Sequence, residues 1–391
     1  MRPIILVDRD IPYAAEILSG LGELRAVPGH EIHRETVREA DAVVVRSITR
    51  VDRTLLEDSR IRFVGTATAG IDHMDTAWLD SAGVEWASAP GANAESVVEY
   101  VLAAMTVIAS RREKSWANRT LGVIGCGEVG ERLAKRVGQV GMRVLRNDPP
   151  RAEKEGAAGF VGLQELLRRA DIVSVHVPLE RDGNHPTAGL LGAEELASMK
   201  PGAWLIQSSR GGTVDEAAAV RARRSGHLGA LVLDVFENEP DPAAAAINAA
   251  DLATGHIAGY SRDAKRNGVL MIRDALSRHM GLEVLPVAST NEQKGPIRLP
   301  SPKQGSLPDP AEPAWMDPVL SRVMDLRSDD ARFRRVMQES SDRALAFHAY
   351  RAGYPARYAW SRYGAAPRSL PEEAMLLALG FRIQPKDDQV V

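Results

Sequence analysis

Three polar residues, Arg210, Glu239 and His256, each follow a short apolar segment that is typical of a buried strand. Histidine exchanges protons near neutral pH, so it is suited to take the proton from a hydroxyl group. A carboxylate can hold an imidazole ring in one tautomer, and an arginine can bind a substrate carboxylate through two hydrogen bonds. Together these side chains could remove a proton from a hydroxy acid. Each of them alone is more often a solvated loop residue.

A glycine-rich segment about a third of the way along the chain has the spacing of a dinucleotide-binding turn. An apolar run at 121–124 precedes it, and a segment of helical composition at 131–136 follows. Glycines at these positions permit a tight turn, close approach of the backbone to a pyrophosphate, and close packing of helix on strand. The residues expected to contact the cofactor are Gly125, Gly127, Glu128, Val129 and Gly130. Because over a hundred residues precede this turn, the cofactor domain is predicted to be inserted into another domain.

An acidic residue, Asp148, stands about twenty residues beyond the glycine-rich turn, at the end of the next predicted strand. A carboxylate there accepts hydrogen bonds from the ribose hydroxyls of NAD and repels the additional phosphate of NADP. NAD is therefore the predicted cofactor. Two alternatives stay open: Asp148 only opens the turn at Pro149 and Pro150, or the nearby Arg151 pairs with the phosphate of NADP.

Composition favours an intracellular enzyme of more than one domain. The 391 residues allow two or three domains, and the formal charge of -3 gives no reason to expect nucleic acid or a membrane surface as a partner. The single cysteine excludes an internal disulfide framework, which suits a reducing cytoplasm. The apolar stretch at the N-terminus is too short for a signal peptide, and no segment is long enough to cross a bilayer. We predict a cytoplasmic protein without a metal site.

Short β-branched runs alternate with helical stretches over residues 1 to about 93, a pattern typical of an open parallel sheet. The clearest buried strands are 42–47 and 61–66. Ligands bind beyond the carboxyl ends of such strands, so Arg46, Ser47 and Thr68 are expected near a substrate. A helix from 94 to about 109 leads into the cofactor domain, and a helix from about 262 to 280 leads back. Between them, strands are predicted at 121–124, 142–148, 172–176, 203–207 and 230–234.

Residues 286–313 are rich in Pro, Ser, Gly and Asn and lack helical periodicity, which predicts a linker. A small third domain is predicted beyond it, at 314–391. Aromatic residues recur in that domain at helical spacing, at Phe347, Tyr350, Tyr354 and Tyr358. A core or a subunit-contact face explains this spacing better than a cofactor platform.

Two features give the chain a resemblance to the D-isomer-specific 2-hydroxyacid dehydrogenases. The segment 65–73 stands where that family has a substrate loop, and Arg210, Glu239 and His256 match its active-site series in order. The resemblance implies an α/β fold in which an NAD-binding Rossmann domain is inserted into a flavodoxin-like α/β substrate domain, followed by a small C-terminal α+β dimerisation domain. The implied ranges are 1–93 with 260–285 for the substrate domain, 94–259 for the NAD-binding domain, 286–313 for the linker and 314–391 for the dimerisation domain.

The same resemblance implies roles for single residues. His256 would donate and accept the proton, with Arg210 and Glu239 beside it. Substrate contacts would fall on Ser47, Thr68 and Tyr260, and further NAD contacts on Asp148, Val177, Ser209, Asp234 and Gly259.

The implied reaction is NAD-dependent oxidation of a small phosphorylated hydroxy acid of four carbons. Within the family, the stretches at 45–51, 89–94, 148–151 and 255–260 resemble the members that act on such a substrate. Arg46 and Arg50 are our candidates for binding the substrate phosphate, although both could simply be solvated at the surface. A homodimer is expected, with no nucleic-acid or membrane partner.

Two alternatives to this function stay open. Another 2-hydroxyacid dehydrogenase, such as a phosphoglycerate dehydrogenase with an added tail, would keep every catalytic residue and differ only in its substrate pocket. A non-enzymatic NADH-sensing protein, similar to the transcriptional corepressors of this fold, would retain these residues too. Departures from the family pattern at Val177, Gly189 and Gln207 remove no catalytic group, although Val177 and Gln207 could loosen contacts with NAD.

Overall fold

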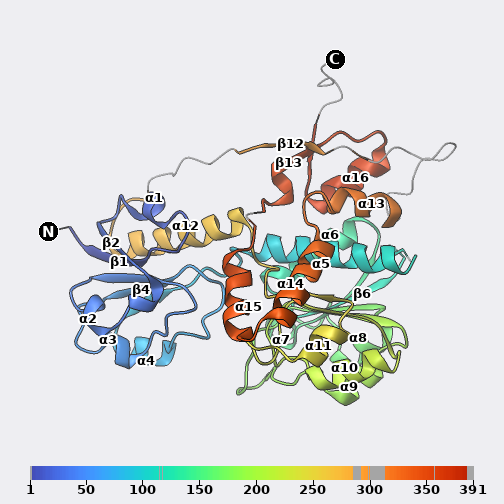
Figure 1. Cartoon of the computed structure of the whole chain (residues 1–391), viewed down its shortest axis with the longest axis horizontal. Coiled ribbons are helices and arrows are strands. Elements are labelled where there is room, and N and C mark those ends of the chain that lie inside the picture. The colour runs from blue at the N-terminus through green and yellow to red at the C-terminus, as the bar shows by residue number, and fades with distance from the viewer. Residues whose placement is uncertain are drawn as a thin grey trace. The chain divides into compact units, whose positions relative to one another are not determined.

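The computed structural model describes residues 2–113, 115–116, 118–284, 292–297, 299, 313–355 and 357–384. It contains two compact units, Met1–Glu95 with Tyr260–Asn291 and Ser96–Gly259 with Glu292–Val391 (Figure 1). The chain therefore leaves the first unit after Glu95, returns to it at Tyr260 and leaves it again after Asn291. Both units contain parallel sheets connected by helices, which confirms the predicted α/β class.

The first unit is built on a five-stranded parallel sheet with the strand order β2-β1-β3-β4-β5. Flavodoxin-like folds have this order. The strands are β1 (Ile4–Asp8), β2 (Glu23–Val27), β3 (Ala42–Val45), β4 (Phe63–Thr66) and β5 (Glu85–Ala87). The connecting helices are α1 (Ala14–Leu18), α2 (Arg34–Val37), α3 (Arg53–Leu56) and α4 (Thr76–Ser81), and the returning segment adds α12 (Arg262–His279).

Alternating residues of these strands build two apolar layers, one on each face of the sheet. Val43 packs with α2, α3 and α4 on one face, whereas Val44 packs with α1 and α12 on the other. The absence of a side chain at Gly65 of β4 lets α12 approach closely, since a Cβ there would lie 2.5 Å from the side chain of Ile272. The returning segment thus completes the core of the first unit.

The second unit contains a six-stranded parallel sheet with the order β11-β10-β9-β8-β6-β7. Its strands are β6 (Thr120–Ile124), β7 (Arg143–Asn147), β8 (Ile172–Val175), β9 (Ala203–Gln207), β10 (Leu228–Leu233) and β11 (Leu252–Ala253). The chain crosses from β7 past β6 to β8, so the direction in which strands are added reverses beside β6. Rossmann folds bind dinucleotides at such a reversal, beyond the carboxyl ends of the strands.

The strands predicted for this sheet are all present, with ends shifted by two residues or fewer. The helices of this part are α5 (Ala94–Arg111), α6 (Glu128–Gln139), α7 (Pro149–Glu155), α8 (Leu163–Arg169), α9 (Ala193–Ser198), α10 (Glu216–Arg224) and α11 (Ala244–Ala249). Within the residues that the structure describes, no helix is both long and apolar enough to cross a membrane.

The C-terminal segment, the described residues between 292 and 384, belongs to the second unit. It contains a three-stranded parallel sheet of β12 (Lys294–Ile297), β13 (Tyr363–Ala365) and β14 (Arg382–Ile383). Its helices are α13 (Pro313–Leu320), α14 (Leu326–Glu339), α15 (Arg343–Ala352) and α16 (Leu370–Leu379). Side chains such as Trp315, Trp360 and Leu376 share one apolar core with Val137 of α6 and Leu121 of β6.

A short strand lies within the predicted linker at 286–313. Lys294–Ile297 forms β12, which pairs in parallel with β13. Pro296 is compatible with this strand because β12 lies at the edge of its sheet, where a missing amide donor is tolerated. The Pro and Gly content of the segment concealed the strand. Most of the remaining predicted linker lies outside the described residues.

Four aromatic residues recur at helical spacing, but they do not all lie on one helix. Phe347 and Tyr350 lie on α15, but the helix ends at Ala352 with Gly353 as its C-cap. Tyr354 and Tyr358 therefore lie beyond the helix. The glycine ends the helix because it loses more conformational freedom than other residues when it is held in a helix.

Candidate active site

The glycine-rich turn joins β6 to α6 in a form that suits a phosphate. Gly125 has a φ of 84°, in the left-handed region that favours glycine. Gly127 is the N-cap of α6, so the first amides of that helix have no partner within the helix. A Cβ at Gly130 would lie only 2.0 Å from the carbonyl oxygen of Gly125, which would push helix and turn apart. The turn therefore fits a pyrophosphate at the helix N-terminus.

Three further residues predicted to contact the cofactor border this turn. Glu128 is exposed and forms an ion pair with Arg132 at 2.8 Å. Val129 is half-buried against the apolar core of the unit. Val177 packs on the turn itself, since a Cβ at Gly125 would come within 2.8 Å of its Cγ1. Val177 thus contributes to the shape of the turn, and its contact with NAD stays a prediction.

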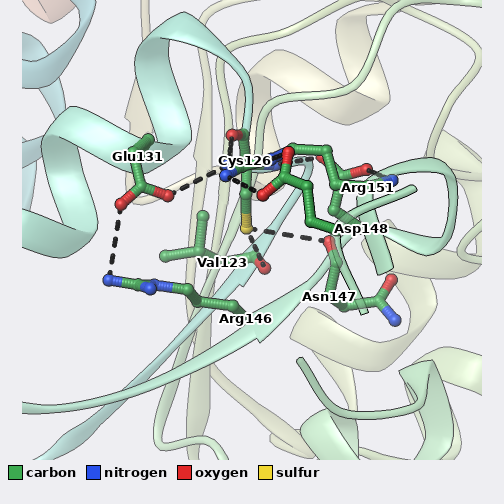
Figure 2. A network of polar contacts seen from close by, with 8 residues as sticks. Val123, Cys126, Glu131, Arg146, Asn147, Asp148 and Arg151 are labelled. Atoms are coloured by element: carbon green, nitrogen blue, oxygen red, sulfur yellow. Dashed lines mark hydrogen bonds and ion pairs between the residues drawn. The ribbon is translucent and has the colours of Figure 1, made fainter. Parts of the chain in front are cut away.

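Asp148 connects the end of β7 to the same turn, as Figure 2 shows. Its carboxylate accepts a hydrogen bond from the Cys126 amide at 2.8 Å. As the N-cap of α7 it also accepts one from the Arg151 amide at 3.1 Å. Asp148 therefore begins the helix that contains Pro149 and Pro150, and it also fixes the glycine-rich turn. Its contact with a ribose stays a prediction.

Arg151 is engaged by two carboxylates. Its guanidinium donates to Glu131 at 3.0 Å and to the Cys126 carbonyl (Figure 2). It also donates to Glu155 at 2.7 Å. The hydrogen bond with Glu155 is the main cause that raises the pKa of Arg151. Because two acidic side chains balance its charge, Arg151 is a poor partner for the phosphate of NADP. Burial raises the pKa of the Cys126 thiol to about 12, so this cysteine is not a nucleophile.

Arg210 lies in a turn that Gln207 organises. The Gln207 side chain donates to the Arg210 carbonyl at 3.0 Å and accepts from the buried Ser209 hydroxyl at 2.9 Å. Gly211 approaches the next loop so closely that a Cβ would lie 1.8 Å from the carbonyl oxygen of Phe236. The turn of Arg210 is thereby fixed against the loop that leads to Glu239. Gln207, a departure from the family pattern, has a clear structural task here.

Glu239 and His256 form the pair that the sequence predicts. Glu239 Oε2 lies 2.8 Å from His256 Nδ1, and Oε1 accepts from the Phe236 amide at 3.0 Å. Burial opposes ionisation of Glu239, but the charge and hydrogen bond of His256 outweigh it, so the pKa of Glu239 lies below its ordinary value. An ionised carboxylate only accepts hydrogen bonds. Nδ1 therefore carries the proton, and Nε2 is the nitrogen that can accept one.

The buried carboxylate of Asp234 holds the loop that carries His256. His256 has a φ of 57°, which is uncommon for a residue with a side chain. Asp234 is fully buried, and its carboxylate accepts three hydrogen bonds from the loop, from the Thr254 hydroxyl at 2.7 Å, the Ile257 amide at 2.8 Å and the Ala258 amide at 2.9 Å. Burial raises the pKa of Asp234, against the opposing charge of His256. Predicted as an NAD contact, Asp234 also sets the conformation of this loop.

The predicted substrate residues lie in the first unit, whereas Arg210, Glu239 and His256 lie in the second. Ser47 is exposed just beyond β3. Thr68 is half-buried, and its hydroxyl donates to the Gly70 carbonyl at 2.9 Å. The Tyr260 ring carries the Lys265 ammonium 4.8 Å from its centre. Tyr260 directly follows the half-buried Gly259. Gly259 is the last residue of the second unit before the chain returns to the first unit.

Arg46 has acidic partners in its own unit. Its Nε donates to the fully buried Asp8 at 2.6 Å, and its Nη2 donates to Asp10 at 2.9 Å. Two carboxylates around one guanidinium give a net negative charge, which disfavours a phosphate. The geometry therefore does not support the prediction that Arg46 binds the substrate phosphate. Arg50, the other candidate, is exposed and pairs with Asp52 at 3.0 Å.

Several residues that organise the site were missed from the sequence. Thr254 links Asp234 to the Tyr100 hydroxyl at 2.7 Å, and Arg357 donates to the Ala258 carbonyl at 2.5 Å. These partners are distant in the sequence, so no local spacing could reveal them. Gln207, which departs from the family pattern, is the one residue of this group that the sequence marks. Its sequence position suggested weaker contacts with NAD, whereas its side chain holds the turn of Arg210.

Comparison with known proteins decides the family. Residues 103–258 match the family model described as the NAD binding domain of D-isomer specific 2-hydroxyacid dehydrogenase. A protein of Salinibacter ruber named erythronate-4-phosphate dehydrogenase is 41% identical over 381 residues, which cover 94% of this chain and 95% of that protein. The chain belongs to the erythronate-4-phosphate dehydrogenase family. A Salmonella typhimurium protein of the same name is 40% identical over 379 residues, 96% of this chain and 97% of that protein.

Solved structures are similar in fold to this member of the erythronate-4-phosphate dehydrogenase family. The Thermus thermophilus protein TT0316 has a TM-score of 0.62 and 29% identity, covering 72% of this chain and 98% of its own. A D-lactate dehydrogenase of Aquifex aeolicus, complexed with NAD and lactic acid, has a TM-score of 0.59 and 24% identity, covering 71% of this chain and 95% of its own. The family and the matched domain confirm two predictions, that the chain is a dehydrogenase and that NAD is its cofactor.

Proposed function

We propose that this chain oxidises 4-phospho-D-erythronate to (R)-3-hydroxy-2-oxo-4-phosphooxybutanoate with NAD, in the biosynthesis of pyridoxal 5′-phosphate (vitamin B6). The observation that carries the proposal is the 2.8 Å contact between Glu239 and His256. It occurs in a chain that matches proteins named erythronate-4-phosphate dehydrogenase over nearly its whole length. A histidine oriented by a carboxylate is the arrangement needed to take a proton from a hydroxyl group.

Each catalytic side chain has one task in the proposed reaction. His256 removes the proton of the 2-hydroxyl through Nε2, because Glu239 holds Nδ1. Glu239 then stabilises the imidazolium that forms. Arg210 binds the substrate carboxylate and orients the carbon beside it. The chemistry that NAD supplies when bound is to accept the hydride from that carbon, so that the alcohol loses one proton and one hydride and becomes a ketone.

The same proposal divides the binding residues between cofactor and substrate. We assign the pyrophosphate to the first amides of α6, between Gly125 and Gly130, and a ribose to Asp148. Further cofactor contacts are assigned to Val177, Ser209, Asp234 and Gly259. Substrate contacts are assigned to Ser47, Thr68 and Tyr260, and the site of the phosphate is not assigned to Arg46.

We also propose a cytoplasmic homodimer that associates through the C-terminal segment. Three leucines of α15 and α16, Leu345, Leu370 and Leu377, are 65%, 81% and 54% exposed. Leu370 and Leu377 stand seven residues apart on α16, about two turns along the helix, and exposed apolar side chains grouped in this way favour association. Cys126 is buried, which suits a reducing compartment. The molecular mass in solution tests the dimer: a double Leu370→Ser and Leu377→Ser variant should be monomeric, and a monomeric wild-type protein would contradict the proposal.

Turnover on four acids tests the proposed substrate. The enzyme is used in excess over substrate, so that NADH which stays bound is also counted. We expect kcat/KM for 4-phospho-D-erythronate to exceed those for 3-phosphoglycerate, glycerate and lactate by at least about a hundredfold. An equal or higher value for 3-phosphoglycerate would identify a different D-2-hydroxyacid dehydrogenase. NADH binding without turnover on any acid would instead indicate a sensor.

A further inference from the structure

The C-terminal segment contacts the catalytic stretch, defined as residues 236–258, which carries both Glu239 and His256. Helix α14, drawn in orange-red in Figure 1, makes two of these contacts. Asp330 accepts a hydrogen bond from the Ala253 amide at 2.8 Å. Arg334 donates to the Ala250 carbonyl at 2.9 Å. These bonds fix the backbone that leads into the loop of His256.

Two aromatic rings of the segment lie directly against that loop. The fully buried Phe333 of α14 stacks on Phe236 with ring centres 5.8 Å apart, and its centre is 5.1 Å from that of Tyr350 on α15. A Cβ at Gly255, the residue before His256, would lie 2.8 Å from each of the rings of Phe333 and Tyr350. The backbone of the loop therefore rests on these rings, and a side chain at this position would force them to move.

Helix α15 holds the loop that follows Glu239. Arg343 donates to Asp241 at 2.6 Å and to the carbonyl of the next residue. Asp241 stands two residues beyond Glu239. Burial alone would raise the pKa of Glu239, but its other contacts outweigh burial, so the pKa lies below its ordinary value. The charge of Arg351, which also lies on α15, is one of these lowering contributions. α15 thus affects both the position and the charge of this carboxylate.

Arg357 binds the loop of His256 at the carbonyl of Ala258, whereas Asp234 binds the same residue at its amide. It is a buried residue, and its Nη2 donates to the Ala258 carbonyl at 2.5 Å and to the Ser96 carbonyl at 3.1 Å. The amide of Ala258 meanwhile donates to Asp234 at 2.9 Å. Both polar backbone groups of Ala258 are therefore held. A buried arginine costs free energy unless such hydrogen bonds satisfy it, so its position is well defined.

We propose that the C-terminal segment is a positioning element of the active site, in which Arg343 and Arg357 hold the loops of Glu239 and His256 in register. This inference rests on the proposed function and goes beyond the dimer role of the segment. Both loops are attached to one packed pair of helices, so the distance between Glu239 and His256 depends on contacts far from the substrate. Misplacement of catalytic groups by about 1 Å lowers rates by about a hundredfold.

Replacement of Arg343 tests this inference in the full-length protein. Arg343→Gln removes the ion pair with Asp241. Arg327→Gln is the matched control, because Arg327 forms a 2.7 Å ion pair with Asp317 in the same segment and is similarly exposed, 34% against 27% for Arg343. We expect Arg343→Gln to lower kcat about tenfold or more without changing KM for NAD, and Arg327→Gln to stay within about twofold of the wild type. Rates are counted per NAD-binding site, so loss of folded enzyme does not contribute.

Hydrogen exchange provides a readout that does not need turnover. In Arg357→Lys we expect the amides of Ile257 and Ala258 to exchange about tenfold faster, with no change in Arg327→Gln. Equal kcat values for Arg343→Gln and Arg327→Gln, or unchanged exchange in Arg357→Lys, would overturn the inference. If the wild type does not oxidise 4-phospho-D-erythronate but the exchange differences appear, the proposed function fails and the positioning role stands.

Discussion

At the scale of single residues, the tautomer of His256 depends on the charge of Glu239. Glu239→Gln tests this dependence, because the amide can donate its own hydrogen to Nδ1 and so favour the wrong tautomer. We expect kcat to fall by about 10²- to 10⁴-fold, with KM for NAD nearly unchanged. Steady-state kinetics with 4-phospho-D-erythronate measures both constants.

A matched control for this substitution is Glu165→Gln, which changes an exposed glutamate paired with Arg169 on α8. It should leave kcat unchanged. Full activity in Glu239→Gln would contradict the orienting role of Glu239.

Two further variants separate the role of His256 from that of Arg210. His256→Ala should abolish turnover. Arg210→Lys should mainly raise KM for the hydroxy acid, since lysine cannot bind a carboxylate in the same bidentate way.

Asp148 permits a second test at this scale, because its helix-capping and charge effects can be separated. Asn is as good an N-cap as Asp, so Asp148→Asn should keep α7 and the fold intact. The loss of charge should raise KM for NAD by about tenfold and improve the use of NADP. Kinetics with both cofactors, beside thermal unfolding, measures this. An unchanged preference between NAD and NADP would show that Asp148 serves the turn alone.

The contact between Glu239 and His256 could be expected because parallel strands bring their carboxyl ends to one edge of a sheet. Both residues follow such a strand or its loop, and their side chains meet at 2.8 Å, whereas the catalytic roles of Arg210, Glu239 and His256 stay predictions. Arg46 stands in a similar position, but its partner Asp8 lies at the end of another strand, β1. Pairing between strands far apart in the sequence leaves no local pattern, and this is why the ion pair of Arg46 with Asp8 could not be expected from the sequence.

At the scale of elements, α14 carries a carboxyl group with a perturbed pKa. Burial raises the pKa of Asp329 to about 6, against a hydrogen bond from Tyr354 and the charge of Arg332. The folded protein therefore binds this proton more tightly than the unfolded chain. Asp329 contributes most to stability below its ordinary pKa of 3.8, and the contribution is lost as the pH rises through about 6.

Asp329→Asn should prevent the loss of stability that ionisation of Asp329 causes, because an amide stays neutral at every pH. The free energy of unfolding of this variant, relative to the wild type, should rise by up to about 3 kcal/mol between pH 4 and pH 7. Denaturant unfolding at a series of pH values measures the difference. Parallel stability curves for the two proteins would contradict the predicted titration of Asp329.

Elements with a strong apolar pattern were predictable, and those fixed by distant contacts were not. Strands such as β3 and β8 are short runs of buried, mostly β-branched residues, which the sequence displays directly. β12 contains Gly295 and Pro296 and exists only because β13 offers it a partner. Aromatic residues at helical spacing continue past Gly353, but α15 ends at Ala352, so this spacing does not mark the end of the helix.

At the scale of the whole molecule, the C-terminal segment shares its core with the nucleotide-binding sheet. Trp360 is fully buried in that core, its amide donates to Glu99 of α5 at 2.6 Å, and its ring stacks on Phe381 at 5.4 Å. Trp360→Ala should therefore destabilise the second unit by about 3–5 kcal/mol. Hydrogen exchange should become faster in β6 and β8, and NAD should restore part of the protection.

The half-buried Trp86 of the first unit provides the control for this prediction. Trp86→Ala should accelerate exchange in β4 and β5 but leave β6 and β8 unchanged. If Trp360→Ala affected only the C-terminal segment, that segment would be an independent domain, and the shared core would carry little of the stability of the nucleotide-binding sheet.

The central claim is that His256 and Glu239 support transfer of the hydride from carbon 2 of 4-phospho-D-erythronate to NAD. A single turnover with substrate deuterated at carbon 2 tests it most directly, with mass spectrometry of the cofactor and the product. We predict deuterium in the reduced cofactor, a 2-oxo product without the label, and no transfer in His256→Ala. Label retained in the product, or transfer that persists in His256→Ala, would contradict the account.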